Sequence, residues 1–444
     1  MANTYLSRTT GTPTNQNKWT WSAWVKFSDD NPAGSRDSTL LSEYYNSGTY
    51  TTYERINISR LRYSTGVSGH GGFVTNRSFA DTNAFYHIVI VNDWSNSTTA
   101  DRIKLYVNGV RETSFASFTA PSSGSSRING DSEALRIGAK NNTLFFNGIM
   151  SHIHFIDGTA YDASAFGETD STTGEWKIKT SPSVTYGNNG FFILKDGNSV
   201  TDQSGNGNNF TVGGGTLTKT EDCPDNVFAT ANPLVGASSS VTYSNGNLTV
   251  AIASSKSTPS TLGAGTGKFY FETKLNNTTN TYIGICSDRN TGTDFGNYRP
   301  LTESALVNNS GTIYTAGGSS GAKGLTGLAD NDIIGCAFDV DNGKVWWSRN
   351  GQWYSGDANP TSTINISDVV AGNNAYSFSS WTGQFILGAF GTSSNANNIS
   401  INFGNGYFGT TAVSSAGTNA SGNGIFEYDV PTGYTALSTK GLNL

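Results

Sequence analysis

The chain is 444 residues long, more than one typical domain and enough for two β-sandwiches with connecting segments. Only 14% of the residues are charged, well below the roughly 25% of ordinary globular proteins, whereas glycine supplies 53 residues and aromatic residues 12%. Aromatic side chains in this proportion exclude a disordered polar chain, because they offset the entropy lost on ordering. The net charge of −6, without a basic cluster, argues against nucleic acid as a partner.

The cysteines and the N-terminal residues limit the class of protein further. Cys223, Cys286 and Cys336 show neither metal-site spacing nor a disulfide framework, and we interpret the last two as buried free thiols. The N-terminus lacks the charged and apolar regions of a secretion signal, and no apolar run approaches the roughly 18 residues of a membrane span. We therefore expect a protein made in a cytoplasm, without membrane insertion and without a cofactor.

Alternation of large apolar with small or polar residues predicts strands early in the chain. The predicted strands cover residues 19–27, 85–93, 102–108 and 149–156. Asn108-Gly109 predicts a hairpin turn between strands. No amphipathic helix of normal length is evident. The strand at 19–27 is predicted to be half-buried, and the pattern as a whole predicts an antiparallel β-sandwich over residues 1–165.

Residues 166–235 are rich in turn formers and poor in strand signals, so we interpret them as an ordered but irregular connector. Further strands are predicted at residues 268–274, 282–286, 333–339 and 344–348. Asn342-Gly343 and Asn350-Gly351 are interpreted as type I′ turns on either side of the last of these. We expect a second sandwich over 236–410 and a C-terminal extension over 411–444. The predicted fold class is all-β, with two antiparallel β-sandwich (jelly-roll) domains in tandem.

Residues in both halves resemble known sandwich families. In the first half the matching residues are the strand around Trp24, Tyr86-His87 before VIVND, LYVNG (105–109), RIGA (136–139) and FNGIMSHIHF (146–155). This block resembles the laminin G and concanavalin A-like family of lectin domains. The second block resembles a SPRY domain through GKFYFETKL, YIGIC, IIGCAFDVDNGKVWWSRNGQW and INFG (401–404). The resemblance implies more about fold than about function, because both families have many roles.

The joining segments carry a third resemblance. These segments are AFGETDSTTGEWKIK, YGNNGFF, DQSGNGNNFT, PDNVFATANPL and the late YDVPTGYTAL. They are similar to joining passages of virion structural proteins from marine bacteriophages, although FFILKDGNS (191–199) is shorter than that pattern. The resemblance implies a virion component such as a tail fibre or other appendage, made in the host cytoplasm and surrounded by other virion proteins.

Acidic residues do not form a recognisable catalytic pair. Glu168, Asp170 and Glu175 are the best candidates for the two carboxylates of a glycoside hydrolase. Their spacing departs from the compact E-x-D-x-x-E arrangement of lectin-like hydrolases, and solvated loop carboxylates explain them better. We therefore predict no catalytic residue and no enzymatic activity.

Possible metal ligands are also incomplete. His152 and His154 alternate on a predicted strand, but no carboxylate or cysteine completes a ligand set, and inward-facing or groove-lining histidines are the favoured interpretation. Asp339 to Gly343 fits a hairpin better than a calcium loop. The loop 93–101 has oxygens that a structural calcium could use, yet nothing in the pattern assigns one. We predict no metal site.

Candidate ligand-binding residues lie in loops of the second sandwich. Tyr298 and Arg299, in FGNYRPLTES, and Trp353 and Tyr354, beyond a turn, combine aromatic rings with hydrogen-bonding groups as carbohydrate sites do. Packing across strands is the alternative for Trp353 and Tyr354. In the first sandwich, a tyrosine-rich run is expected to form an exposed loop or edge or a subunit interface. Its members are Tyr44, Tyr45, Tyr50 and Tyr53.

These observations predict a non-catalytic virion surface or appendage protein, a tail fibre, that binds a host-surface glycan or protein. A homo-oligomer is expected, because several weak contacts made together give avidity. One alternative is an architectural virion protein, a capsid decoration or connector without host binding. Further alternatives are a polysaccharide-degrading enzyme, which lacks its carboxylate pair, and a cellular adhesin, which the missing secretion signal disfavours.

Overall fold

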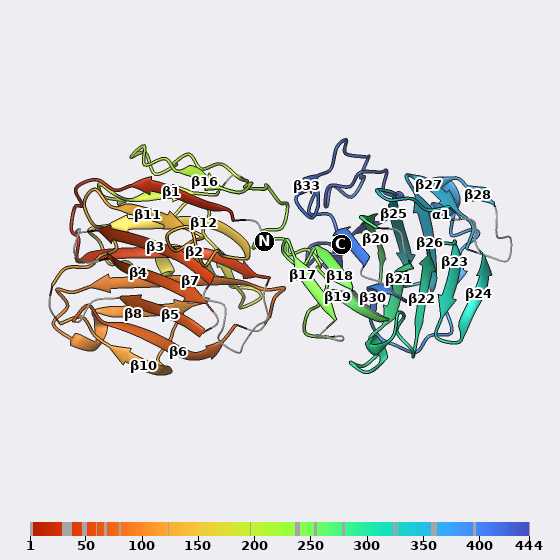
Figure 1. Ribbon diagram of the computed structural model, residues 1–444, viewed down its shortest axis with the longest axis horizontal. Coiled ribbons are helices and arrows are strands. Elements are labelled where there is room, and N and C mark those ends of the chain that lie inside the picture. The colour runs from red at the N-terminus through yellow and green to blue at the C-terminus, as the bar shows by residue number, and fades with distance from the viewer. Residues whose placement is uncertain are drawn as a thin grey trace. The chain divides into compact units, whose positions relative to one another are not determined.

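The computed structural model describes residues 3–28, 38–46, 51–58, 60–65, 69–79, 81–122, 124–195, 197–235, 240–252, 255–277, 280–322, 325, 327–356, 362–393 and 397–443. The chain divides into two compact units, Met1–Lys219 with Cys223–Asp225 and Thr220–Asp222 with Asn226–Leu444. In each unit the regular secondary structure is almost entirely β-strand (Figure 1). The prediction of an all-β protein made of antiparallel sandwiches is confirmed.

One sheet of the first unit contains eight strands within the described residues. In spatial order they are β10 (Phe115–Thr119), β6 (Gly72–Ser78), β5 (Arg60–Thr65), β4 (Thr51–Ile58), β3 (Ser38–Asn46), β11 (Ala134–Ile137), β1 (Tyr5–Thr9) and β16 (Thr211–Gly214). Neighbouring strands are antiparallel throughout. The last strand comes from the segment predicted as a connector, which therefore extends this sheet.

The second sheet of this unit packs against the first. Its described strands are, in spatial order, β15 (Phe191–Ile193), β12 (Gly148–Asp157), β2 (Lys18–Phe27), β7 (Phe85–Asp93), β8 (Ile103–Val107) and β9 (Val110–Arg111). Trp19, Trp21, Ala23 and Val25 of β2 point into the core between the two sheets, where alternation places them. Asn108 and Gly109, with φ of 48° and 79°, form the predicted turn between β8 and β9.

The outer face of the second sheet is covered as well, so β2 is buried on both faces rather than half-buried as predicted. Val89 and Ile156 of the sheet pack beneath Phe166 and Trp176, which come from the connector segment. That segment forms a short hairpin, β13 (Gly167–Thr169) with β14 (Trp176–Ile178). The first unit therefore has a third layer, which alternation within β2 could not reveal.

The second unit also contains two packed sheets. The described order of its larger sheet is β17 (Val241–Ser244), β18 (Thr249–Ile252), β31 (Asn397–Asn402), β20 (Lys268–Leu275), β25 (Ile333–Asp339), β26 (Lys344–Arg349), β27 (Gln352–Tyr354) and β28 (Thr363–Ile364), and β29 (Tyr376–Ser377) pairs with β26. The smaller sheet has the described order β19 (Lys256–Ala264), β30 (Ile386–Thr392), β21 (Thr281–Ser287), β22 (Ser304–Asn308), β23 (Thr312–Thr315) and β24 (Gly318–Ala322).

The remaining described elements are short. They are the strands β32 (Tyr407–Phe408) and β33 (Thr411–Ala412), the α-helix α1 (Ile366–Ala371), and the 3₁₀ turns Thr99–Asp101, Ala163–Ala165, Asp294–Gly296 and Gly441–Asn443. None of the helices in the described part of the chain has the length and apolar character needed to span a bilayer. Cys286 and Cys336 are buried free thiols, as predicted, whereas Cys223 is partly exposed.

The two predicted type I′ turns have different outcomes. Asn350 and Gly351 have φ of 49° and 82°, which confirms that turn. At Asn342-Gly343 the prediction is wrong, because Gly343 has a φ of 61° but Asn342 is not left-handed. Asp339 pairs directly with Lys344, which leaves a four-residue loop. The Asp339 carboxylate fixes that loop by accepting hydrogen bonds from Asn342 N (3.0 Å) and Nδ2 (2.8 Å).

The segment after residue 411 folds onto the second unit. Strand β34 (Thr435–Ala436) pairs in parallel with β20, and Phe426, Val430 and Tyr434 belong to the core. The Glu272 carboxylate of β20 accepts hydrogen bonds from the backbone N–H groups of Glu427 and Tyr428, both at 2.9 Å. The residues predicted as a C-terminal extension therefore contribute to the core of this unit.

Candidate binding site

A cluster of tyrosines lies on the outer face of the smaller sheet in the second unit. Along β21, Ile283 and Ile285 point into the core, so Tyr282 and Cys286 point outward. Tyr298, from the loop between β21 and β22, packs against Tyr282 with ring centroids 4.7 Å apart. Tyr314 of β23 contacts Tyr282 edge-on at 5.2 Å. Three segments distant in sequence thus form one aromatic surface.

The loop that carries Tyr298 is held tightly against the sheet. Phe295 of this loop is buried in the same outer cluster. A Cβ atom at Gly391 of β30 would lie 2.0 Å from the carbonyl oxygen of Tyr298, so only glycine permits this approach. The loop and its side chains are therefore positioned before any ligand arrives.

Arg299 covers this tyrosine cluster. Its guanidinium carbon lies 4.7 Å from the ring centroid of Tyr298 and 5.9 Å from that of Tyr314. Its Nε donates to the carbonyl oxygen of Thr315 at 2.7 Å, and its Nη1 donates to the hydroxyl of Tyr298. The ring face beneath Arg299 is thus not open for sugar stacking, and the site instead presents guanidinium and phenol groups for hydrogen bonding.

The other two candidate residues lie in the larger sheet. Trp353 of β27 is only 3% exposed and packs near Tyr270, with ring centroids 6.1 Å apart. Tyr354 is partly buried and packs against the same core. The structure therefore brings Tyr298 and Arg299 together but separates them from Trp353 and Tyr354, whose positions match the cross-strand packing alternative.

The tyrosine-rich run of the first unit is described only in part. Tyr44 lies on β3 and is partly buried. Tyr50 and the side chains of Tyr45 and Tyr53 lie outside the described residues.

The acidic residues considered for hydrolysis are engaged in a surface hairpin. Asp170 accepts hydrogen bonds from the backbone N–H groups of Thr173 and Thr172 and from the Lys177 ammonium group, at 3.0, 2.8 and 3.1 Å. These bonds lower the pKa of Asp170 to about 2. Glu168 pairs with the same lysine at 3.6 Å. A carboxyl group that acts as a general acid needs a raised pKa, whereas the pKa of Asp170 is lowered.

A buried serine–histidine pair in the first unit was not evident in the sequence. His87 Nε2 and the Ser22 hydroxyl are 2.8 Å apart, and Trp176 Nε1 donates to His87 Nδ1 at 2.9 Å. Because Nδ1 accepts, a neutral imidazole carries its proton on Nε2 and donates it to Ser22. Burial lowers the pKa of His87 to about 3. The imidazole therefore cannot act as a base toward this serine. Only the short distance in space, not the spacing in sequence, reveals the pair.

His152 and His154, on β12 of the same sheet, do not follow the regular two-residue alternation of a strand. A β-bulge between Ser151 and His154 interrupts the pairing of β12, and His152 has a φ of 48°. His154 is buried, lies 3.9 Å from the Phe192 ring centroid and bonds to the Tyr186 hydroxyl at 2.9 Å. Burial holds its pKa well below the ordinary value. In the described part of the chain, no three His, Cys, Asp or Glu residues gather as a metal site would require.

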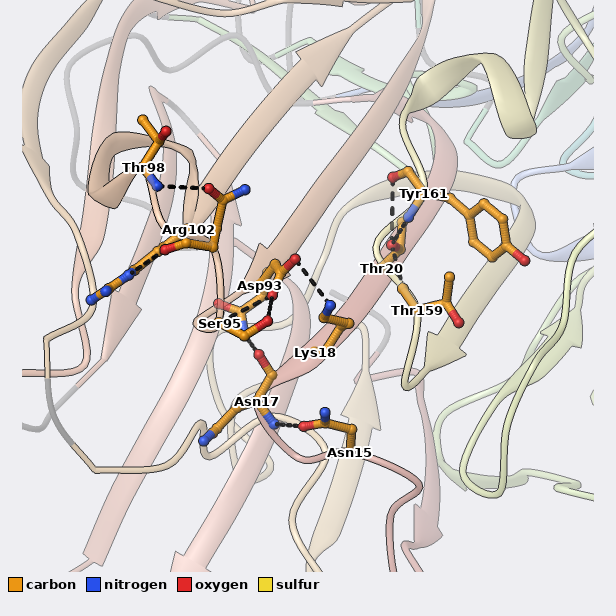
Figure 2. Close-up of polar contacts among 12 residues, drawn as sticks. Asn15, Asn17, Lys18, Thr20, Asp93, Ser95, Thr98, Arg102, Thr159 and Tyr161 are labelled. Atoms are coloured by element: carbon orange, nitrogen blue, oxygen red, sulfur yellow. Dashed lines mark hydrogen bonds and ion pairs between the residues drawn. The ribbon is translucent and has the colours of Figure 1, made fainter.

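The loop after β7 uses its oxygens internally (Figure 2). Asp93 Oδ1 accepts hydrogen bonds from Ser95 N and Oγ, at 3.1 and 2.5 Å, and Oδ2 pairs with the Lys18 ammonium at 3.2 Å. Asn96 accepts from Thr98 N at 2.9 Å and from Arg102 Nε at 3.1 Å. These contacts are those of a self-supporting loop.

Comparison with known proteins identifies the two sandwiches. Residues 2–164 match the concanavalin A-like lectin/glucanases superfamily, and residues 268–363 match the SPRY domain. A concanavalin A-like domain thus precedes a SPRY domain, as the sequence resemblance implied. Both are folds of binding and interaction domains. No curated protein sequence matches the chain.

Solved structures with similarity to the chain include two SPRY domains and a toxin. The SPRY domain of human HERC1 is 15% identical, with a TM-score of 0.29, covering 38% of this chain and 96% of that one. The TRIM65 PSpry domain is 13% identical, with a TM-score of 0.28, covering 39% and 91%. Stonustoxin is 15% identical, with a TM-score of 0.28, covering 57% of this chain and 33% of that one.

Proposed function

We propose that this protein, in which a concanavalin A-like sandwich precedes a SPRY sandwich, is a non-catalytic surface component of a bacteriophage virion, a tail fibre or related appendage. Its role is to bind a glycan or protein on the host surface. The joining segments support the virion assignment through their resemblance to passages of marine bacteriophage structural proteins. The two domain classes support a binding role.

The observation that carries the binding proposal is the Tyr298–Arg299 site. The guanidinium of Arg299 and the phenol of Tyr298 lie on a loop that Phe295 and Gly391 hold in place, and the phenol of Tyr314 lies beside them on β23. A site positioned before binding loses little conformational entropy when its ligand arrives. The low pKa of Asp170 and the proton arrangement of His87 support the non-catalytic part of the proposal.

The test is co-sedimentation of the labelled protein with candidate host cells, before and after their surface polysaccharide is removed. We expect Arg299→Met to weaken binding by about 10- to 100-fold, because a charge-assisted hydrogen bond contributes about 1.5–3 kcal/mol. Arg111→Met is the matched control, since Arg111 is a surface arginine of the first unit paired with Asp101. It should bind as the parent does.

Failure to bind any cell across a broad host panel, even as an oligomer, would support the architectural alternative. If the Arg299→Met variant binds cells as well as the parent does, host recognition would stand, but the Tyr298–Arg299 site would not be responsible for it. Release of reducing sugar ends during the incubation would refute the non-catalytic assignment.

A further inference from the structure

The Tyr298–Arg299 site of the second unit contains hydrogen-bond donors that the protein itself does not use. In Arg299, Nε donates to the carbonyl oxygen of Thr315 and Nη1 donates to the hydroxyl of Tyr298. Nη2 has no hydrogen-bond partner among the residues that the structure describes, and it is open to solvent. Both N–H groups of Nη2 are therefore available to a ligand.

Two phenol groups beside Arg299 add further donors. The Tyr298 hydroxyl accepts from Arg299, so its own hydrogen remains available. The Tyr314 hydroxyl has no hydrogen-bond partner within the described part of the chain, and it too is open to solvent. Burial raises the pKa of Tyr282, and the nearby phenols of Tyr314 and Tyr298 raise it further. The hydroxyls of these tyrosines thus lie close together, beside the guanidinium.

The acidic residues of the same loop are engaged elsewhere. Asp294 accepts hydrogen bonds from within its own loop. Asp288 and Glu303 accept hydrogen bonds from backbone N–H groups of residues 382–385. No carboxylate of the described residues forms an ion pair with Arg299. The site therefore combines a positive charge and unused donors with no anion of its own, which suits a ligand that brings an oxyanion.

We propose that the Tyr298–Arg299 site binds a sulfate or phosphate ester carried by a glycan of the host surface. A carboxylate presents two oxygens in one plane, and a single edge of a guanidinium satisfies it. A tetrahedral ester presents three terminal oxygens and can accept from Arg299, Tyr298 and Tyr314 together. Unmodified peptides carry carboxylates but no such ester, so donors on three different side chains favour a glycan over a protein.

This inference rests on the proposed function and deepens it, because it assigns a ligand class to the same site. Isothermal titration calorimetry of the purified full chain tests it without a host cell. The probes are dextran oligomers of equal length that are sulfated, phosphorylated or neutral, together with an oligouronate of the same length. The first two probes distinguish the two sources of a tetrahedral oxyanion, and the oligouronate carries carboxylates alone.

We expect the sulfated and phosphorylated oligomers to bind, and the tighter of the two identifies the ester that the site takes. The oligouronate should bind about 10-fold more weakly, because a carboxylate leaves one charge-assisted hydrogen bond unmade. Neutral dextran should not bind. Equal affinity for the oligouronate, or no binding of either ester, would overturn the proposal.

Variants of the two side chains with unused donors test the site itself. Arg299→Met should weaken ester binding by about 10- to 100-fold. Tyr314→Phe keeps the ring that packs against Tyr282 and removes only the hydroxyl. It should weaken ester binding by about 10-fold and leave the thermal unfolding midpoint unchanged, which separates binding from a structural role.

Each variant has a matched control. Arg289→Met removes an exposed arginine from the same loop, and Tyr106→Phe removes a partly buried phenol hydroxyl from the first unit. Each control should weaken ester binding by less than about 2-fold. Equal losses in Arg299→Met and Arg289→Met, or in Tyr314→Phe and Tyr106→Phe, would show that the esters do not bind at this site.

This inference and the proposed function can fail separately. Cells bound through Arg299, without binding of either ester, would leave the proposed function standing and remove the ester site. Esters bound through Arg299 and Tyr314, with no host cell bound, would keep the ester site and overturn host recognition.

Discussion

Trp176 shows how a single side chain of this protein depends on two glycines, one in its own hairpin and one far away in the sequence. A Cβ atom at either Gly109 or Gly167 would lie 2.5 Å from the Trp176 ring. The tryptophan therefore occupies a slot that only these glycines leave open, and from it donates its hydrogen bond to His87. The outer layer of the first unit is fixed at this point by shape and by one directed bond.

Closing the slot should destabilise the first unit. We expect Gly167→Ala to lower its free energy of unfolding by about 1–3 kcal/mol, because the added methyl group displaces the Trp176 ring. Chemical denaturation followed by tryptophan fluorescence would measure the change. Gly292→Ala is the control, since a Cβ atom at Gly292 meets nothing within 4 Å. Equal stability of the two variants would contradict this account of the slot.

His87 should make the stability of the first unit depend on pH. Its folded-state pKa of about 3 lies below the ordinary value of 6.5, so the unfolded state binds more protons as the pH falls from 6.5 toward 3. Stability is therefore present above pH 6.5 and lost on acidification, by about 2 kcal/mol between pH 7 and pH 5.

The His87→Gln variant isolates this effect, because glutamine can still accept from Trp176 and donate to Ser22 without titrating. We expect the difference in unfolding free energy between parent and variant to shrink by about 2 kcal/mol from pH 7 to pH 5. Denaturant titrations at both pH values would measure it. A difference that stays constant with pH would show that His87 is accessible to protons in the folded state.

At the scale of elements, short peptides outside the main strands complete both units. Strand β16 extends one sheet of the first unit, and β34 joins the larger sheet of the second. Glu272 binds the peptide before β34 through two backbone N–H groups, while Tyr270 and Asn402 donate to the same carboxylate at 3.0 and 3.4 Å. Such elements are structural members of the sandwich although they are only two to four residues long.

Adjacent residues of that peptide offer a test. Phe426 is 1% exposed, with its ring 5.0 Å from that of Tyr270, whereas Ile425 is 36% exposed. We expect Phe426→Ala to lower the unfolding free energy of the second unit by about 3–5 kcal/mol. Ile425→Ala should lower the unfolding free energy by less than about 1 kcal/mol, because a side chain that remains partly exposed to solvent loses less burial energy when it is truncated. Similar losses in denaturant titrations would show that the peptide does not dock as described.

The main strands could be predicted from sequence, because alternation and turn residues are local signals. The predicted strand at 85–93 coincides with β7, and that at 333–339 with β25. The outer layer could not be predicted, since the slot of Trp176 depends on Gly109 and Gly167, which approach only in three dimensions. Tyr298 and Arg299 are adjacent in the sequence, but the packing of Tyr282 and Tyr314 around them depends on strands that meet only in the folded sheet.

At the scale of the whole molecule, the two units should respond to pH in opposite directions. In the first, burial lowers the pKa of both His87 and His154. In the second, burial raises the pKa of Glu272 to about 7, against the hydrogen bonds that lower it. A raised folded-state pKa means stability that is complete below the ordinary carboxyl range and lost as the pH rises through 7.

Hydrogen exchange resolved by peptide would show this contrast. Between pH 7 and pH 5, after correction for intrinsic exchange, protection of β7 should fall and protection of β20 should rise, each by about 1–2 kcal/mol. The Glu272→Gln variant should remove the pH response of β20 and leave that of β7 unchanged. Parallel changes in both units would contradict the opposite burial effects.

The pairing of β34 with β20 also sets an order of events during synthesis. β20 leaves the ribosome long before residues 435 and 436, yet its place in the sheet is complete only when they arrive. The last described strand of the first unit ends at Gly214, so this unit can fold while the ribosome is still translating the second one. A messenger truncated after residue 410 would therefore yield a finished first sandwich attached to an unfinished second one. The peptide that carries β34 thus determines when the second sandwich can be completed.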